Sequence, residues 1–161
     1  MAAMVEEHPE IQVFDEIGLI DGGVRAIVTR CLPVGLTYPQ FDVLNLLARR
    51  GEGLTPGQLA AALQMTPGAI TNTLERLEAT GLATVEADPV DRRRKHVAMT
   101  PAGRQAYQRA MAAIKPRMGS LRESFTQKEF REALPFLKAL RAWIEDETAR
   151  LSTPPGALAA E

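Results

Sequence analysis

The 161-residue sequence contains one cysteine, no long apolar run, and no Lys or Arg among its first 21 residues. A single cysteine excludes an internal disulfide and is typical of a protein in a reducing cytoplasm. A membrane span needs 18 or more apolar residues in succession, so we expect no membrane partner. The acidic start also lacks the positive charge of an export signal, and we therefore predict a cytoplasmic protein.

Recognisable catalytic chemistry is also missing. The sequence has no Gly-x-Ser-x-Gly, P-loop or Gly-x-Gly-x-x-Gly pattern. His8, Cys31 and His96 lack the spacing of zinc ligands. Asp88 and Asp91 lie in a turn beside cations, whereas an acid–base pair needs a cleft. We predict no metal, no cofactor and no enzymatic activity.

Charge is distributed unevenly along the chain. The net charge is −1, but residues 1–21 carry six acidic side chains, whereas residues 88–109 carry six Lys or Arg and only two acids. Affinity for phosphates depends on the local field, not on the charge of the whole chain. The basic region is therefore a candidate site for nucleic acid.

Most of the predicted helices begin with threonine, which can act as an N-cap. Proline follows directly in three cases, and Gln or Glu follows three residues later in three cases, as in a capping box. These threonines are Thr37, Thr55, Thr66, Thr100 and Thr126. The patterns predict helices over residues 10–31, 38–50, 56–63, 67–80, 101–121 and 127–151. Pro116 and Pro135 lie inside the last two helices and should bend or locally break them.

Two short strands are predicted at residues 82–87 and 94–99, joined by a turn. The helices at 56–63 and 67–80 are separated by a tight turn, which is the spacing of a helix-turn-helix. In the second of them, Ile70, Leu74 and Leu77 fall on one face, which we expect to point inward. The fold class is therefore mainly α with a small β-hairpin wing: a winged helix-turn-helix with flanking helices.

The other faces of the helix at 67–80 suit contact with DNA, because small and short polar residues let a recognition helix approach base edges closely. The candidate residues are Thr66, Pro67, Gly68, Ala69, Thr71, Asn72 and Arg76. Asn72 can bridge two edges of an adenine, Thr71 can contact a thymine methyl group or a phosphate, and Arg76 can reach a guanine or a phosphate. The alternative is that these are ordinary exposed polar positions.

The predicted hairpin carries four consecutive cations at its tip: Arg92, Arg93, Arg94 and Lys95. They cannot all point into a core, and a wing can place arginine in the minor groove. Asp91 would be repelled by DNA, so we expect it to pair with Arg93 or a neighbour and to brace the loop. The alternative is a solvated charged loop.

Residues 88–103 resemble the wing of MarR-family transcriptional regulators, whose pattern is roughly D-x-x-D-R-R-x-x-x-V-x-L-T-x-x-G, with Met99 in place of the leucine. Residues 54–63 and 66–82 resemble the two reading helices of the family, and the similarity covers about residues 36–105. The resemblance implies that Asp91 braces the wing and that Arg92 or Arg93 enters the minor groove. It also implies a regulator, most often a repressor, that a small ligand releases from DNA. The ligand would bind where the winged helix-turn-helix, which we call the head, meets the flanking helices that form the dimer.

The flanking helices carry narrow apolar stripes suited to helix–helix packing. The head leaves little surface for three such helices, so we predict a homodimer; the alternative is an intramolecular bundle. The predicted interface residues are Val13, Ile17, Ile20, Phe130, Leu137, Leu140 and Ile144. A two-fold dimer would place two recognition helices roughly 34–36 Å apart on a pseudo-palindromic operator in double-stranded DNA.

We therefore divide the chain into an N-terminal dimerisation helix (10–35), a winged helix-turn-helix DNA-binding region (36–100) and C-terminal dimerisation helices (101–151). The predicted function is a homodimeric, sequence-specific transcriptional regulator that a small-molecule effector releases from DNA. Two alternatives remain. Cys31 can make the protein thiol-responsive, although its apolar stripe favours packing. A winged helix can also bind protein, which requires an exposed apolar patch on the recognition face.

Overall fold

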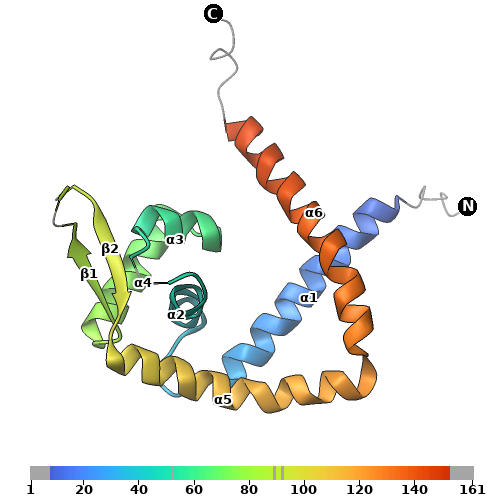
Figure 1. Ribbon diagram of the computed structural model, residues 1–161, viewed down its shortest axis with the longest axis horizontal. Coiled ribbons are helices and arrows are strands. Elements are labelled where there is room, and N and C mark those ends of the chain that lie inside the picture. Colours follow the sequence, from blue (N-terminus) through green and yellow to red (C-terminus); the bar gives the residue numbers. More distant parts are fainter. Residues whose placement is uncertain (1–7, 52, 89, 92, 153–161) are drawn as a thin grey trace, which may run out of the picture. The chain divides into compact units, whose positions relative to one another are not determined.

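The computed structural model describes residues 8–51, 53–88, 90–91 and 93–152. Their elements, in chain order, are α1 (Pro9–Cys31), α2 (Tyr38–Arg50), α3 (Pro56–Leu63), α4 (Pro67–Ala79), β1 (Ala83–Ala87), β2 (Lys95–Met99), α5 (Pro101–Ser124) and α6 (Gln127–Ser152) (Figure 1). The predicted fold class is confirmed. The bounds agree to within one residue, except that α5 continues three residues further than expected.

Side-chain caps fix where the helices begin. At α3 the backbone N–H of Thr55 donates to Oε1 of Gln58 at 2.9 Å, and the N–H of Gln58 donates to Oγ1 of Thr55 at 3.2 Å. This is the reciprocal capping box that the sequence predicts. At α2 the hydroxyl of Thr37 donates to Oε1 of Gln40 at 3.0 Å. The backbone N–H of Thr37 donates to the same oxygen.

The core of the head lies between α2, α3, α4 and the hairpin. Ile70, Leu74 and Leu77 are all buried, which confirms the inward face of α4. The largest fully buried side chains are Leu44, Leu47, Leu59, Leu77, Val43 and Val97. Burial of such aliphatic side chains stabilises each of them by about 1.5–3 kcal/mol relative to exposure.

Parts of the flanking helices belong to this core as well. Val28 near the end of α1, and Ala110 and Ile114 in α5, are buried in the same cluster. We expected these helices to find little of the head to pack against, and that expectation is wrong for these two segments. These two segments are used within the chain because they pack against the core of the head.

The hairpin is tied to the rest of the head on two sides. β1 and β2 pair antiparallel, with Ala83 opposite Met99 and Ala87 opposite Lys95. On the other edge of β2, the N–H of Val97 donates to the carbonyl of Leu54 at 2.9 Å, and the N–H of Gly53 donates to the carbonyl of Val97 at 3.1 Å. The loop before α3 therefore acts as a short third strand at the base of the wing.

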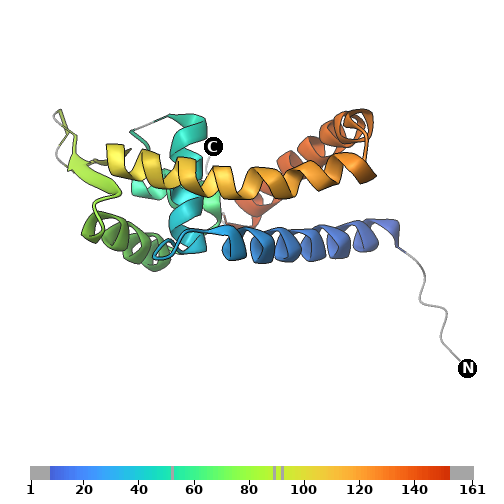
Figure 2. The same cartoon turned by 90° about the horizontal axis from the view of Figure 1, so that it is seen from below.

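The chain divides into two compact units, residues 1–116 and 117–161. The first contains the head, α1 and the start of α5, and in both views the N-terminal part of α1 extends away from α2, α3 and α4 (Figures 1 and 2). The second contains the end of α5 together with α6. This division is based on contacts within the chain. The three functional regions (10–35, 36–100 and 101–151) stay a prediction.

Both internal prolines lie in continuous helices. α5 runs through Pro116, and α6 runs through Pro135 without a break. The local break that we considered does not occur, and Figure 1 shows α6 changing direction along its length, as expected when proline removes a hydrogen bond. None of the helices in the described part of the chain combines the length and the apolar character needed to cross a bilayer.

Candidate nucleic-acid interface

α4 presents a small and polar surface to solvent. Its first turn, Pro67–Ala69, is exposed, and Thr66 caps it by accepting the N–H of Ala69 at 3.2 Å. Thr71, Asn72 and Arg76 are exposed as well. Because no bulky side chain stands in front of this turn, its backbone can come close to the base edges of a major groove.

The three polar side chains of this face differ in what they can still bind. The hydroxyl of Thr71 donates to the carbonyl of Pro67 at 2.8 Å, so its proton is used inside the helix. The methyl group of Thr71 and a lone pair of its hydroxyl oxygen remain available for contact with DNA. Within the described residues, no hydrogen bond engages the amide of Asn72, which keeps the donors and the acceptor that match an adenine edge. Asn72 is therefore the stronger candidate for reading a base.

Asn72 and Arg76 border a hollow between α4 and the start of α2. Thr37 and Gln40, which form the cap of α2, border the same hollow. Arg76 is thus placed beside polar groups of a second element. Such a donor-rich surface suits a phosphate or a base edge.

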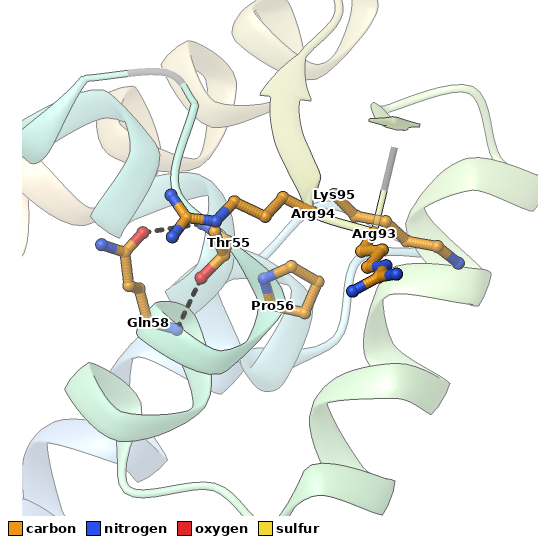
Figure 3. Close-up of a pocket in the computed structure, with 6 residues that line it drawn as sticks. All are labelled: Thr55, Pro56, Gln58, Arg93, Arg94 and Lys95. Carbon is orange, nitrogen blue, oxygen red and sulfur yellow. Dashed lines mark hydrogen bonds between the residues drawn. The ribbon is translucent and has the colours of Figure 1, made fainter. Parts of the chain in front are cut away.

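The wing brings three exposed cations beside the start of α3. Arg93, Arg94 and Lys95 line a hollow of about 540 Å³ together with residues of the α3 cap. Figure 3 shows the side chain of Arg94 reaching toward Thr55, while Arg93 and Lys95 point to the opposite side. Positive charge therefore lies on both sides of the wing. Arg92 is outside the described residues, and its role stays a prediction.

Asp91 is held by the loop that it was expected to brace. Its Oδ1 accepts the backbone N–H of Arg93 at 3.1 Å, and its Oδ2 lies 3.8 Å from Nε of Arg94. The N–H of Arg94 also donates to the carbonyl of Asp91 at 2.8 Å. The acid thus faces the backbone of one arginine and the side chain of the next, an arrangement that suits the predicted bracing role.

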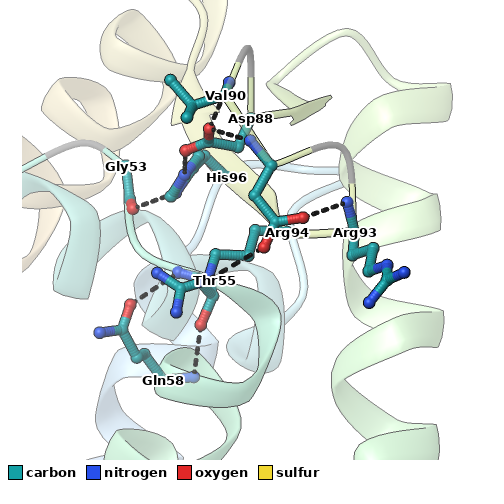
Figure 4. A network of polar contacts seen from close by, with 9 residues as sticks. Gly53, Thr55, Gln58, Asp88, Val90, Arg93, Arg94 and His96 are labelled. Atoms are coloured by element: carbon teal, nitrogen blue, oxygen red, sulfur yellow. Dashed lines mark hydrogen bonds and ion pairs between the residues drawn. The ribbon is translucent and has the colours of Figure 1, made fainter.

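A second network, which we did not predict, lies where the tip loop of the wing begins (Figure 4). Oδ1 of Asp88 accepts the N–H groups of Val90 at 2.8 Å and Asp91 at 2.9 Å. Its Oδ2 lies 2.6 Å from Nε2 of His96, and Nδ1 of His96 lies 2.7 Å from the carbonyl oxygen of Gly53. The hairpin register, in which Glu86 pairs with His96, places Asp88 close to that histidine.

These contacts shift both pKa values. The backbone N–H of Asp91 and then the His96 side chain stabilise the Asp88 carboxylate and lower its pKa to about 2. The hydrogen bond to Asp88, followed by the one to Gly53, raises the pKa of His96 above its ordinary value. Both shifts favour an ion pair between Asp88 and His96.

The predicted dimer residues are divided between exposed and half-buried positions. Ile20, Phe130 and Leu137 are 60%, 47% and 43% exposed. The half-buried ones are Val13, Ile17, Leu140 and Ile144. Among the described side chains of α6, none is buried, and the helix also exposes Leu134, Phe136 and Trp143. An exposed apolar surface of this kind is a candidate interaction surface.

Other features bear on the alternatives. Cys31 is half-buried and packs against the core. Over the whole of α3 and α4, which are fully described, no large hydrophobic side chain is exposed, so the recognition face lacks the apolar patch that protein binding requires. No group of three or more His, Cys, Asp or Glu suited to a metal ion occurs in the described parts of the chain.

Comparison with known proteins gives consistent matches. The model of the MarR family matches residues 34–94. The chain is 30% identical over 105 residues to the HTH-type transcriptional repressor Rv2887 of Mycobacterium tuberculosis (strain ATCC 25618 / H37Rv), covering 63% of this chain and 75% of that protein. It is 30% identical over 118 residues to the transcriptional activatory protein BadR of Rhodopseudomonas palustris, covering 71% and 65% of the two chains. The structure of CouR from Rhodococcus jostii RHA1 bound to p-coumaroyl-CoA superposes with a TM-score of 0.71 at 26% identity, covering 84% and 95%.

Proposed function

The chain belongs to the MarR family of transcriptional regulators, and on this basis we propose that it is a homodimeric repressor that a small-molecule effector releases from a pseudo-palindromic operator. The observation that carries this proposal is the pairing of two surfaces on one head. α4 offers a polar face with the exposed amide of Asn72, and the adjacent wing offers exposed cations at Arg93, Arg94 and Lys95. One surface suits base edges, and the other suits phosphates or the minor groove.

In this proposal α4 enters the major groove. Asn72 and Arg76 read base edges, because their side chains are exposed and border one hollow beside the helix. The wing lies over the neighbouring backbone, where Arg93 reaches the minor groove or a phosphate. Phosphate contacts set the register of the protein on DNA, and the base contacts give sequence preference.

A second copy of this chain is the proposed partner of the apolar face of α6. No described side chain of α6 is buried in the single chain, although the helix carries large apolar residues along one stripe. Exposure of such a stripe to water is costly, and a two-fold partner would cover it with the same stripe. The resulting dimer would present two copies of α4 to successive major grooves.

Repression is supported by the relative Rv2887, which is named a repressor, whereas BadR is named an activatory protein. Release by a ligand is supported by CouR, whose structure is bound to p-coumaroyl-CoA. A repressor acts by occupying DNA that the transcription machinery needs. A ligand that binds the DNA-free conformation more tightly than the DNA-bound one would lower the affinity for DNA by the ratio of its own two affinities. Such a regulator would work in the cytoplasm, where the DNA is.

The first test is binding to the DNA upstream of the chain's own gene, measured by mobility shift at moderate salt. We expect a retarded complex that a scrambled duplex of the same length does not compete away. Equal affinity for the scrambled duplex would contradict sequence-specific regulation. Addition of p-coumaroyl-CoA, with free coenzyme A as the control, then tests release by one acyl-CoA ligand.

Arg93→Ala is expected to weaken DNA binding about fivefold to tenfold and to reduce the slope of log affinity against log salt by about one unit, because one cation–phosphate contact is lost. Fluorescence anisotropy over a series of salt concentrations measures both. Lys128→Ala removes an equally charged, exposed side chain from α6 and is the matched control. An unchanged slope in Arg93→Ala would remove this side chain from the interface.

Asn72→Ala is expected to relax sequence preference at one base pair of each half-site by about fivefold or more, because a bidentate amide–adenine contact discriminates by about 1–3 kcal/mol. Selection of bound duplexes from a random pool, done with wild type and variant in parallel, measures the change. Arg93→Ala is the comparison, since it should weaken all sequences alike. An identical consensus sequence for the wild type and for Asn72→Ala would show that this amide does not read a base.

A further inference from the structure

We propose that His96 is a positioning residue for DNA binding, whose doubly protonated ring fastens the wing to the loop before α3. Deprotonation of the ring loosens this fastening and weakens DNA binding. The inference rests on the proposed function, because the wing must contact DNA if deprotonation of His96 is to weaken DNA binding. We call the contact between Gly53, Asp88 and His96 the wing latch (Figure 4).

The geometry of the wing latch selects the protonated ring. Nε2 of His96 faces a carboxylate oxygen of Asp88 at 2.6 Å, and Nδ1 faces the carbonyl oxygen of Gly53 at 2.7 Å. Both partners can only accept a hydrogen bond, since a carbonyl has no proton and the Asp88 carboxyl is ionised near neutral pH. Only the imidazolium has two N–H groups. A neutral ring would leave one nitrogen lone pair against an oxygen.

The latch joins the hairpin and its loop to the segment before α3, which is distant from them in the sequence. Gly53 lies before α3, His96 lies in β2, and Asp88 lies where the wing loop begins. Asp88 in turn accepts the N–H of Asp91, and Asp91 accepts the N–H of Arg93. The backbone that carries the wing cations is therefore connected to the head through the His96 ring.

The charges around the ring come from the hairpin and its loop. Glu86 is the cross-strand partner of His96, and Asp88 and Asp91 belong to the loop. Arg94 opposes protonation of the ring, and Lys95 is the neighbouring residue in β2. The described residues of the loop before α3, and Thr55 and Gln58 at the start of α3, are uncharged. The contact with Asp88 dominates, and the pKa of His96 is raised as a result.

The direction of the pH effect follows from linkage. A histidine whose folded pKa exceeds its unfolded value, about 6.5, adds stability that is complete below that value and is lost as pH rises through the folded pKa. The wing should therefore be fastened in mildly acidic solution and should loosen on the alkaline side. We expect DNA affinity to fall about threefold to tenfold between about pH 6 and pH 8.5, since one hydrogen bond of the latch is lost.

The test measures affinity against pH at constant ionic strength, using a duplex selected from a random pool by the wild-type protein. His96→Gln and His96→Asn cannot titrate, and their amides stand near Nε2 and Nδ1 respectively, so each keeps a donor for one of the two acceptors. Both variants should bind as weakly at all pH values as the wild type does on the alkaline side. His8→Gln removes the other histidine and should keep the wild-type profile.

The Asp88→Asn variant should favour the neutral ring of His96 instead of the protonated one. The amide oxygen can still accept the N–H groups of Val90 and Asp91, while the amide nitrogen would donate to Nε2 of a neutral His96 ring. The remaining ring N–H would donate to Gly53. The pKa of His96 should then fall, and affinity should not change between about pH 6 and pH 8.5.

NMR titration of the His96 ring in the DNA-free protein separates the latch from the proposed function. A raised pKa that falls in Asp88→Asn supports the latch even if no DNA is bound, and absence of DNA binding by every variant would overturn the proposed function instead. A pKa at or below the ordinary value would overturn the latch. So would a wild-type affinity that is flat with pH, or a pH profile that survives in His96→Gln.

Discussion

Leu137→Glu is expected to yield a folded monomer that binds the operator at least about 100-fold more weakly than the wild-type chain. Leu137 is 43% exposed in the single chain and lies on the apolar stripe of α6. In the proposed dimer this position faces a second copy, so the variant would bury two unpaired carboxylates, a change that costs several kcal/mol. The affinity falls because each head then binds its half-site alone and loses the gain of linked sites.

Light scattering coupled to size exclusion measures the mass, and anisotropy measures the affinity. Ala139→Glu is the matched control, because Ala139 is exposed on the opposite side of α6 and the same acid there should leave the dimer intact. Circular dichroism of both variants establishes that the helices are retained. A dimeric Leu137→Glu protein would show that this stripe is not the contact between the two copies.

Gly103→Ala is expected to lower the free energy of unfolding by about 3 kcal/mol, at the upper end of what overpacking costs. Gly103 is buried at the start of α5. An added Cβ would overlap the carbonyl oxygen of Leu82 and would lie 2.9 Å from Cγ of Met99. The carbonyl cannot easily move away, because it accepts the backbone N–H of Thr100 at 3.1 Å.

Thermal unfolding followed by circular dichroism should show a midpoint roughly 6–12 °C lower, given a shift of about 2–4 °C per kcal/mol for a chain of this size. Gly119→Ala changes a glycine of the same helix where an added Cβ would meet no atom within 4 Å. That control should be neutral or stabilising by up to about 1 kcal/mol, since alanine favours a helix. Equal midpoints for the two variants would contradict the close approach of α5 to Leu82.

Two proposed contacts of the wing illustrate how local and long-range information differ. The role of Asp91 was expected, because its partners Arg93 and Arg94 are two and three residues away and a turn brings them together. The wing latch was not expected, because Gly53 and His96 are 43 residues apart. The sequence shows that both residues are present but not that β2 pairs with the loop before α3.

The sequence also does not show what the flanking helices pack against. The sequence shows apolar stripes on these helices, but a stripe does not state what covers it. Val28 and Ile114 pack on the head of the same chain, whereas Leu137 stays exposed. Only the arrangement of the elements in space separates residues that are buried in the fold from residues that stay exposed.

The sequence by itself determined the elements, the inward and outward faces of α4, and the family, because caps, periodicity and the motif of residues 88–103 act over short separations in the chain. The tertiary structure alone decided that His96 joins Asp88 to Gly53, that Gly103 must lack a side chain, and that α1 and α5 contribute to the core of the head. Such contacts depend on distances between segments, and residue spacing along the chain does not specify those distances.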